Sequence, residues 1–489
     1  MNANNTTPQQ GAAVKVGAVV GFLIFVELTS GFIQGYYLPL FGSIAQHLGV
    51  SDADITWFNT IQTLAAAVCV PILAKLGDMF GHRRMLRIGI ISVFIGVLIT
   101  AFVPSYPAVL AGRLLVGPLA VWLPLEIAII HSRIQGETGR KAIGFLVSAL
   151  TGGAVLGSIV GGLFGSRLPI VIALAVPAII VLLCVIVVFT VVPDSFERNP
   201  VRIDWLGFIL LAVSMLALLF GMRLAQAEGF ASLTPWACLI VGFVAVAVFV
   251  WWELRIPNPA INIRVVTSRA LWPAYATSFL FGMALFGTQT ITTTFLAAPG
   301  AEVGYGFGFK TSVIGLFTAG SALCAVIGAA VFANLARVIT IRGVLLLAVS
   351  VAAVGNIMLA VGHTSLTVVI VSIVASGLAG GLLLGALPAL VAERSPRSET
   401  GIATGLYNTL KTLGGALAGA VFAVVLSAFT APGAAYTSAG GYVSVWIICA
   451  AGFALAALIL LLVRVQGTQT MALTVQDAET EINTEGVTE

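Results

Sequence analysis

The chain has 489 residues, of which 59% are hydrophobic and only 9% are charged. So few charged side chains cannot cover the surface of a water-soluble domain, which excludes an ordinary soluble protein. The formal net charge of +4 does not indicate a nucleic-acid partner, because the basic residues are scattered through short loops. The five cysteines have neither metal-ligand spacing nor the pattern of a disulfide framework, so we expect them to be buried, reduced and structural.

Fourteen apolar stretches of membrane-spanning length follow one another along the chain, and they predict an all-α polytopic membrane protein. A helix needs roughly 20 apolar residues to cross about 30 Å of hydrocarbon. An even number of spans places both termini on the same side of the membrane. The expected spans are 16–41, 55–77, 86–104, 108–130, 141–163, 168–192, 205–226, 234–254, 270–297, 311–334, 342–361, 365–391, 402–429 and 440–464.

The distribution of basic residues predicts that both termini are cytoplasmic. With the termini inside, cytoplasmic segments hold 18 of the 23 Lys and Arg residues, whereas the external loops hold three, Arg167, Arg223 and Lys310. Short cytoplasmic loops carry such an excess of basic residues. The first apolar stretch is too long for a signal-peptide h-region, so we expect no cleavable signal peptide.

The order of the spans predicts four sections of chain. Residues 1–192 are expected to form a six-helix bundle with a short cytoplasmic N-terminus, and 269–465 a second six-helix bundle. Residues 193–268 comprise a polar linker and two additional helices, and 466–489 an acidic, disordered cytoplasmic tail. The glycine-rich segments 152–157 and 414–419 echo each other, as expected of parallel repeats.

A charged turn between the second and third spans resembles the loop signature of the major facilitator superfamily, G-x-L-[GA]-D-[RK]-x-G-[RK]-[RK]. Ala74, Met79 and His82 depart from that pattern. The matching residues are Leu76, Gly77, Asp78, Gly81 and Arg83, and a further basic residue, Arg84, follows directly. The segment 112–117 is similar to the R-x-x-x-G pattern of the fourth span in the same family.

Three further segments, 204–207, 253–255 and 401–409, resemble the fourteen-span drug/proton antiporter branch of that superfamily. Two positions depart from the branch. Ser30 stands where an Asp is usual, with Glu27 one turn earlier, and Ser158 replaces the proline of the fifth-span signature. The resemblance implies two six-helix bundles with two extra central helices, a cavity between the bundles, and transport by alternating access.

Two acidic residues, Glu27 and Glu126, lie well inside spans 1 and 4. An intramembrane charge is costly, so it usually faces a cavity or a partner. The resemblance places both spans along the central cavity, where two partly dehydrated carboxylates suit proton coupling, since a bound organic cation and a proton compete for them. The alternative is a protonated acid that is hydrogen-bonded to a neighbour and fixes helix packing.

Two cations also lie within spans. Arg113 is expected in the outer half of span 4, where it biases proton movement or pairs with a polar group of span 1; the alternative is a packing cation bonded to carbonyl oxygens. Lys411 lies near mid-depth in span 13. It is either the counter-ion of a cavity carboxylate or an anchor for an anionic substrate, and the sequence does not separate the two.

Polar side chains in otherwise apolar spans are candidates for lining the cavity, because hydrogen-bonding groups are wasted against lipid. Span 9 carries Gln289 and Thr292 within the polar run 288–294. The remaining candidates are Gln34, Tyr36, Tyr37, Asn59, Gln62, Asn356 and Asn408. Aromatic groups with scattered polar groups suit a large amphipathic ligand, although about half of these residues are expected to be structural.

Two features suggest conformational gating. Glycine at every fourth position, including Gly157 and Gly161 in span 5 and the stripe at 377, 381 and 385 in span 12, allows close helix contact for rocking or for static packing. In the charged turn, we expect Asp78, beside Gly81, to sit on a helix N-terminus of the opposite half. We expect Arg83 and Arg84 to add ion pairs between the bundles.

The sequence therefore predicts a proton-coupled exporter of amphipathic, cationic drugs in a bacterial inner membrane, acting as a monomer. We expect no enzymatic activity and no cofactor, metal or nucleic-acid partner. The segment most similar to a phosphate-loop motif, 304–311, has Phe309 where the motif requires Gly. The alternatives are export of a specific, possibly anionic, metabolite or antibiotic, uptake by proton symport, and a non-transporting sensor or scaffold.

Overall fold

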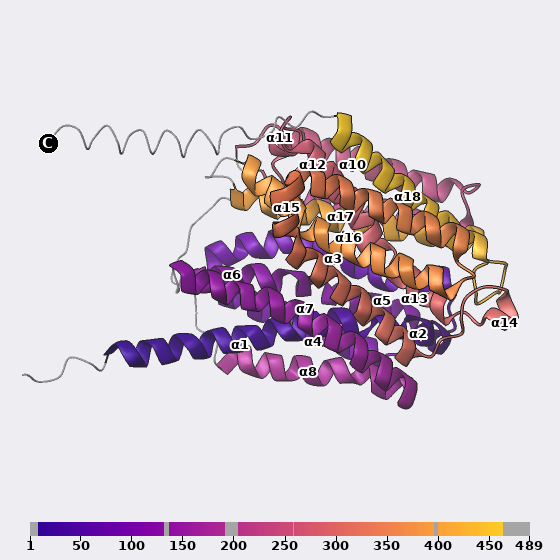
Figure 1. Ribbon diagram of the computed structural model, residues 1–489, viewed down its shortest axis with the longest axis horizontal. Helices are drawn as coiled ribbons and strands as arrows, with labels where there is room; N and C mark the ends of the chain where they lie inside the picture. The colour runs from indigo at the N-terminus through magenta and orange to yellow at the C-terminus, as the bar shows by residue number, and fades with distance from the viewer. Residues whose placement is uncertain (1–7, 132–135, 191–203, 258, 396–399, 463–489) are drawn as a thin grey trace, which may run out of the picture.

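The computed structural model describes residues 8–131, 136–190, 204–257, 259–395 and 400–462 (Figure 1). Within these ranges the secondary structure is entirely helical, with turns between the helices. Twelve of the helical segments described are long and apolar enough to cross a membrane. Phe145, Phe243 and Leu316 on the outside of the molecule are each more than 60% exposed, as expected of side chains that face lipid.

The first half of the chain contains eight α-helices and two short 3₁₀ segments in its described part. Helix α3 begins where the Ser51 hydroxyl caps the Asp54 amide, and it ends at Gly81, whose φ of 101° only glycine adopts readily. Pro118 lies in the 3₁₀ segment that divides α5 from α6. The bounds are α1 Pro8–Tyr36, η1 Leu38–Leu40, α2 Phe41–Leu48, α3 Asp52–Phe80, α4 His82–Phe102, α5 Tyr106–Val116, η2 Gly117–Val121, α6 Trp122–His131, α7 Gly136–Arg167 and α8 Ile170–Thr190.

The second part of the chain begins with two helices that follow the linker, α9 and α10. Asp204 caps the first of them, because its side chain accepts a hydrogen bond from the Gly207 amide. The bounds are α9 Trp205–Glu228, α10 Leu233–Glu253, α11 Ile263–Val266, α12 Trp272–Gly287, α13 Gln289–Ala297, α14 Gly300–Val303, α15 Thr311–Gly362, α16 Leu366–Arg394, α17 Thr400–Ala428 and α18 Ala439–Leu462.

The twelve candidate spans differ from the fourteen expected ones at two places. Helix α1 is not among the twelve, and α15 covers both of the expected spans 311–334 and 342–361. Helix α15 is broken at Thr340, where φ is 67° and ψ is 160°. A left-handed φ at a β-branched residue interrupts a helix. The break therefore lies between the two expected spans.

Apolar cores form separately in the two halves. One buried cluster contains residues between Leu23 and Val188 only, whereas a second joins α9, α10, α12 and α15–α18 with three residues of α3. A third cluster lies mainly around α13 and α18. In Figure 1 the indigo and magenta helices accordingly lie below the orange and yellow ones. We call the end where α1 begins and α18 ends the termini end, and the end with α2 and α14 the far end.

Glycines allow the closest helix contacts within each half. A Cβ on Gly157 or Gly161 would overlap the carbonyl oxygen of Phe32 or Tyr36, so α7 packs against the backbone of α1. Helices α12 and α17 meet in the same way at Gly282 and Gly414. These contacts confirm the close helix packing that the glycine stripe predicts.

Candidate functional site

Glu27 and Glu126 are buried together in the first half of the molecule. Glu27 on α1 is 1% exposed and Glu126 on α6 is 0% exposed. Glu126 lies within electrostatic range of Glu27, and both lie within electrostatic range of Cys184 on α8. In the described ranges, Glu27 Oε2 and both carboxyl oxygens of Glu126 have no hydrogen-bond partner. Two ionised carboxylates in such surroundings would repel each other strongly, so the pair is suited to binding a proton.

Two polar side chains follow Glu27 on the same face of α1. Ser30 and Gln34 follow Glu27 at helical spacing on one face of α1, and Gln34 Nε2 donates to Ser30 Oγ at 3.3 Å. Ser30 is buried, whereas Gln34 is exposed. The structure thus places the predicted cavity residue Gln34 and its partner Ser30 on the face of α1 that carries Glu27.

Arg113 on α5 lies buried at the start of α3 and the end of α1. Its guanidinium donates to Gln62 Oε1 and stacks on two rings, 4.2 Å from the centre of Phe58 and 4.6 Å from that of Tyr37. Arg113 therefore contacts the ring of Tyr37, a polar residue of the expected span 1, while its hydrogen bond goes to Gln62 of α3. The flat guanidinium prefers an aromatic face because that contact needs little desolvation of a second charge.

The two predicted tyrosines have different surroundings. Tyr36 is fully buried and its hydroxyl donates to the Ala173 carbonyl of α8 at 2.7 Å. Tyr36 therefore lies in the packing between α1 and α8, and not at the cavity-lining position that we expected. A buried phenol hydroxyl needs a hydrogen-bond partner, and the nearby carbonyl supplies it. The Tyr37 hydroxyl has no partner in the described part of the chain.

Asn59 and Gln289 connect the two halves in the first third of α3. Asn59 Nδ2 donates to Gln289 Oε1 at 3.2 Å and to the Phe286 carbonyl at 3.1 Å. Thr292, half-buried, follows Gln289 on α13. The structure therefore brings three of the predicted lining residues to one crossing between the halves.

Lys411 and Asn408 lie together on α17, away from the buried carboxyl pair. Lys411 Nζ donates to Asn408 Oδ1 at 3.1 Å and lies 5.0 Å from the centre of the Tyr407 ring. Asn408 is exposed and Lys411 is half-buried. Asn356, by contrast, donates to the Ala352 carbonyl of its own helix at 2.8 Å, which is a structural role.

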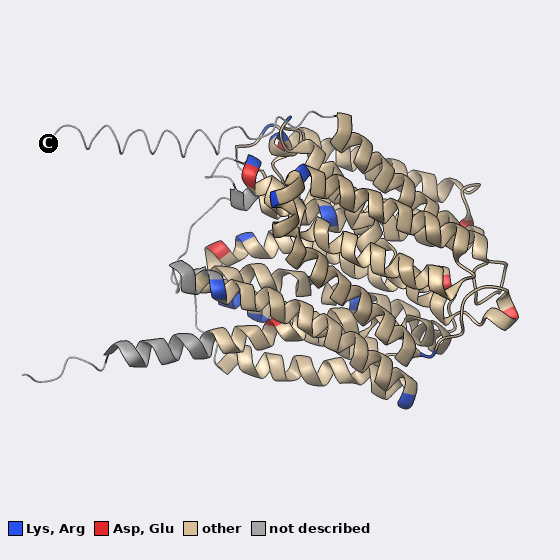
Figure 2. Ribbon diagram, in the orientation of Figure 1, with Lys and Arg blue, Asp and Glu red and all other residues tan. Residues whose placement is uncertain are grey.

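At the termini end, the charged turn has contacts with residues of the first half. Figure 2 shows most of the Lys and Arg segments at this end. Asp78 Oδ1 lies 2.9 Å from His82 Nε2. Arg83 Nη2 donates to the Phe189 carbonyl of α8 at 3.4 Å, whereas Arg84 is exposed. This contact of Arg83 forms because the end of α8 lies beside the start of α4, and the ion pairs between the bundles stay a prediction.

The predicted gating glycines, Gly157 and Gly161, lie inside the first half. The neighbouring Gly162 lies at the contact between halves, where a Cβ would lie 2.7 Å from the Thr311 carbonyl oxygen of α15. Gly315 of α15 packs in return against the Ser158 carbonyl oxygen. Ser158, which replaces the signature proline, donates its hydroxyl to the Gly35 carbonyl at 3.2 Å.

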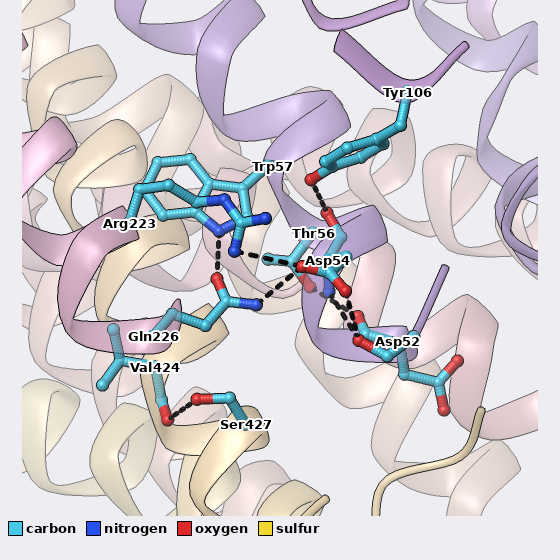
Figure 3. Close-up of polar contacts among 10 residues, drawn as sticks. Asp52, Asp54, Thr56, Trp57, Tyr106, Arg223, Gln226, Val424 and Ser427 are labelled. Carbon is cyan, nitrogen blue, oxygen red and sulfur yellow. Dashed lines mark hydrogen bonds and ion pairs between the residues drawn. The ribbon is translucent and has the colours of Figure 1, made fainter. Parts of the chain in front are cut away.

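At the far end, Asp54 joins α3 to α9 (Figure 3). Its Oδ1 accepts from Arg223 Nη1 at 3.1 Å and from Gln226 Nε2 at 3.0 Å. Trp57 donates to the same Gln226, and the Tyr106 hydroxyl donates to the Asp54 carbonyl at 2.7 Å. Arg223 and Gln226 present both donors from one face of α9, because they are three residues apart.

Asp52, one turn before Trp57, joins α3 to the loop before α18. Asp52 Oδ2 accepts from the Tyr442 hydroxyl at 2.7 Å and from the Thr437 amide at 3.4 Å. The Asp52 amide donates to the Ala435 carbonyl at 3.2 Å. We call Asp52, Asp54, Arg223, Gln226 and Tyr442 the far-end cluster. A cavity of about 750 Å³ beside it is lined by α2, α3, α9, α13 and residues 427–436.

The sequence analysis missed the far-end cluster. One signal was available, because Ser51 and Asp54 have the spacing of a capping box that exposes acidic groups at a helix start. Another was the scarcity of basic residues in the loops assigned to the outside, which singles out Arg223. Neither signal identifies the residue with which Asp54 or Arg223 pairs.

Comparisons with known proteins agree with this architecture. A family model described as Major Facilitator Superfamily matches residues 23–419 and 292–478. The chain is 25% identical over 434 residues to the multidrug efflux pump LfrA of Mycolicibacterium smegmatis, covering 88% of this chain and 83% of that protein. It is 25% identical to the uridine/deoxyuridine transporter of Lactococcus lactis, covering 64% and 66%. The solved structure of the nucleoside transporter NupG superposes with a TM-score of 0.64 at 16% identity, covering 91% and 98%, which shows a shared fold.

Proposed function

This chain belongs to the Major Facilitator Superfamily, and we propose that it exports amphipathic, cationic compounds in exchange for protons by alternating access. Membership of this family makes it a multi-pass membrane transporter of small molecules. The observation that carries the proton-coupled export of cations is the carboxyl pair Glu27 and Glu126, buried without donors for three of its four oxygens in the described ranges. The similarity of the whole chain to LfrA and to the quinolone resistance protein NorB of Staphylococcus aureus supports a drug substrate.

The proposed coupling uses competition between a proton and a cation. When no substrate is bound, one proton on the pair cancels one of its two negative charges and relieves their repulsion. The positive charge of a substrate that approaches Gln34 and Ser30 favours release of that proton. Proton return then lowers the attraction for the cation and releases it. The pair lies inside one half, so protonation can change without disrupting the helix contacts that build it.

The topology we propose has fourteen crossings with both termini in the cytoplasm. Helix α15, with 52 residues, would be about 78 Å long if it were straight, far more than the hydrocarbon thickness. The break at Thr340 supports two crossings in α15, and we propose α1 as a further one. The boundaries are 1–192 and 269–465 for the two bundles, 193–268 for the linker with the extra pair α9–α10, and 466–489 for the tail.

With this orientation the far end is external and is closed by the far-end cluster, so transport requires those contacts to break. Asp78, Gly81, Arg83 and Arg84 lie at the cytoplasmic end, where we propose that they act when that end closes. We further propose that the protein works as a monomer in a bacterial inner membrane, without a cofactor or a nucleic-acid partner, and that it catalyses no chemical reaction.

A second candidate is transport of a specific, anionic metabolite. Lys411, half-buried beside Asn408 on α17, is the observation that favours it, since the ammonium group has no carboxylate partner in the described ranges. Similarity to a uridine/deoxyuridine transporter supports a specific metabolite as the substrate, and we keep uptake by proton symport as the alternative direction.

The test is proton release from purified protein in detergent when a panel of lipophilic cations is added. We expect about one proton per bound cation for the wild type, and at least a tenfold loss of this signal in Glu27→Gln or Glu126→Gln. Glu228→Gln, at an exposed position on α9, is the matched control and should release protons normally. Folded wild type that releases no proton with any cation would contradict the proposal, and binding of anions lost in Lys411→Gln would favour the second candidate.

A further inference from the structure

Two sequence signatures with no part in the proposed cycle meet at the termini end. Asp204 precedes α9, and its Oδ1 accepts from the Gly207 amide at 2.9 Å and from Trp252 Nε1 at 3.0 Å. Glu253 ends α10, and its Oε2 accepts from the Ile261 amide at 3.2 Å. Each carboxyl group is therefore held in place through one of its two oxygens.

The second oxygens of these carboxyl groups face each other. A Cβ on Gly207 would overlap both Asp204 Oδ2 and Glu253 Oε1, which places the two oxygens on the same side of the Gly207 backbone. The two side chains are within hydrogen-bond reach of one another. In the described part of the chain neither oxygen has a donor, and Glu253 is 3% exposed. Gly207 is thus required to leave room for the pair.

The described cations around the pair donate no hydrogen bond to its two facing oxygens. Lys75 of α3 lies within electrostatic range, but its Nζ donates to the Pro259 carbonyl at 2.9 Å. Arg255 stacks 4.0 Å from the centre of the Trp251 ring, and Arg264 donates to the Leu254 carbonyl at 2.7 Å. Among the described residues, these are the cations that face α9 and α10 here, so the two facing oxygens meet without a basic partner.

Two facing carboxylate oxygens repel each other unless a proton or a cation lies between them, and a shared proton makes a short, strong hydrogen bond. We infer that Asp204 and Glu253 form a second proton-binding site, in which one proton is shared between Asp204 Oδ2 and Glu253 Oε1. The proton comes from bulk water and returns to it, so no other reactant is needed. When the proton leaves, Lys75 is the nearest counter-ion, and its attraction to the pair ties α3 of the first half to α9 and α10.

The test is infrared spectroscopy of purified protein without substrate, titrated from low to high pH in the Glu27→Gln/Glu126→Gln background. We expect a protonated-carboxyl band that shifts in D₂O and disappears in both Asp204→Asn and Glu253→Gln. The amide of each variant donates a hydrogen bond in place of the proton, so both should fold. Glu228→Gln, at the other end of α9, is the matched control and should keep the band.

A band that is unchanged in both variants would overturn the shared proton. A band that appears only after Na⁺ and K⁺ are removed would also overturn it, because a metal cation would then occupy the site. Gly207→Ala should weaken the band, since the added methyl group pushes the two oxygens apart. The measurement uses no substrate, so failure of the proposed drug export leaves its outcome unaffected.

Discussion

Two pairs of acidic residues in this molecule lie in opposite surroundings. Glu27 and Glu126 lie within one half, and three of their four oxygens have no donor in the described ranges. Asp52 and Asp54 lie between elements of different halves and accept hydrogen bonds from α9, α18 and the loop before it. An unpaired acid can exchange a proton while its helices stay in place, whereas a paired acid releases its partners only when the helices separate. The first arrangement suits ion binding, and the second suits holding a conformation.

This comparison requires that the half carrying Glu27 and Glu126 be rigid. The substitution with the largest expected effect tests that rigidity. Gly157→Val would push a side chain into the Phe32 backbone of α1. Because this crossing cannot expand without moving α1, we expect a loss of about 3 kcal/mol or more of stability. The measurement is thermal unfolding in detergent. Gly152→Val on the same helix is the control, since a Cβ there meets open space; equal unfolding temperatures for the two variants would contradict the rigid crossing.

Removal of Asp54 should have the next largest effect, on conformation and not on proton binding. Asp54→Ala removes the acceptor of Arg223 and Gln226 and leaves a partly buried cation unpaired, which costs about 2 kcal/mol. We expect the population open at the far end to rise about 30-fold. Distances between spin labels at Ser105→Cys and Glu228→Cys would report it.

A double-mutant cycle separates the ion pair from a general loss of packing. Arg223→Ala and Asp54→Ala should each open the far end, and the double variant should open it less than the sum of the two, with a coupling of about 1 kcal/mol. Additive effects would show that the contact between the two side chains does not hold the halves together. Proton release on cation binding should survive in all three variants.

The smallest effect is expected from Tyr442→Phe. This change removes one hydrogen bond to Asp52, while the Thr437 amide remains as a donor. The loss should be about 1 kcal/mol, which is roughly a fivefold rise in the open population by the same label distances. Tyr436→Phe, half-buried on the wall of the neighbouring cavity, is the control. A response equal to that of the control would show that Tyr442 does not help to hold the far end closed.

Intramembrane acids were the easiest site residues to predict. Glu27 and Glu126 stand out because each lies in a long apolar stretch, and the structure places them near each other. Asp54 and Arg223 did not stand out, because charges near span ends are ordinary and their pairing depends on how α9 packs beside α3. The acidic signatures at Asp204 and Glu253 were visible as separate motifs, but nothing in their spacing shows that two of their oxygens face each other.

The glycine pattern predicted a close helix contact but not which helix makes it. The stripe in α7 predicted a close contact, and the structure supplies α1 as its partner at Gly157 and Gly161. Gly162, the next residue, turns toward α15 of the other half. Adjacent helix positions differ by about 100°, so one glycine pair serves two contacts, and only the packed molecule shows which contact lies between the halves.

The sequence by itself determined the membrane environment, the approximate spans and the family, because the transfer of a segment into lipid depends on its own composition and a loop signature is local. The tertiary structure decided the pairing of Asp54 with Arg223, the packing of Tyr36 against α8, and the meeting of Asp204 with Glu253. These contacts join side chains that are 49 to 169 residues apart in the printed chain. Their geometry depends on how all the helices pack at once, which no single segment encodes.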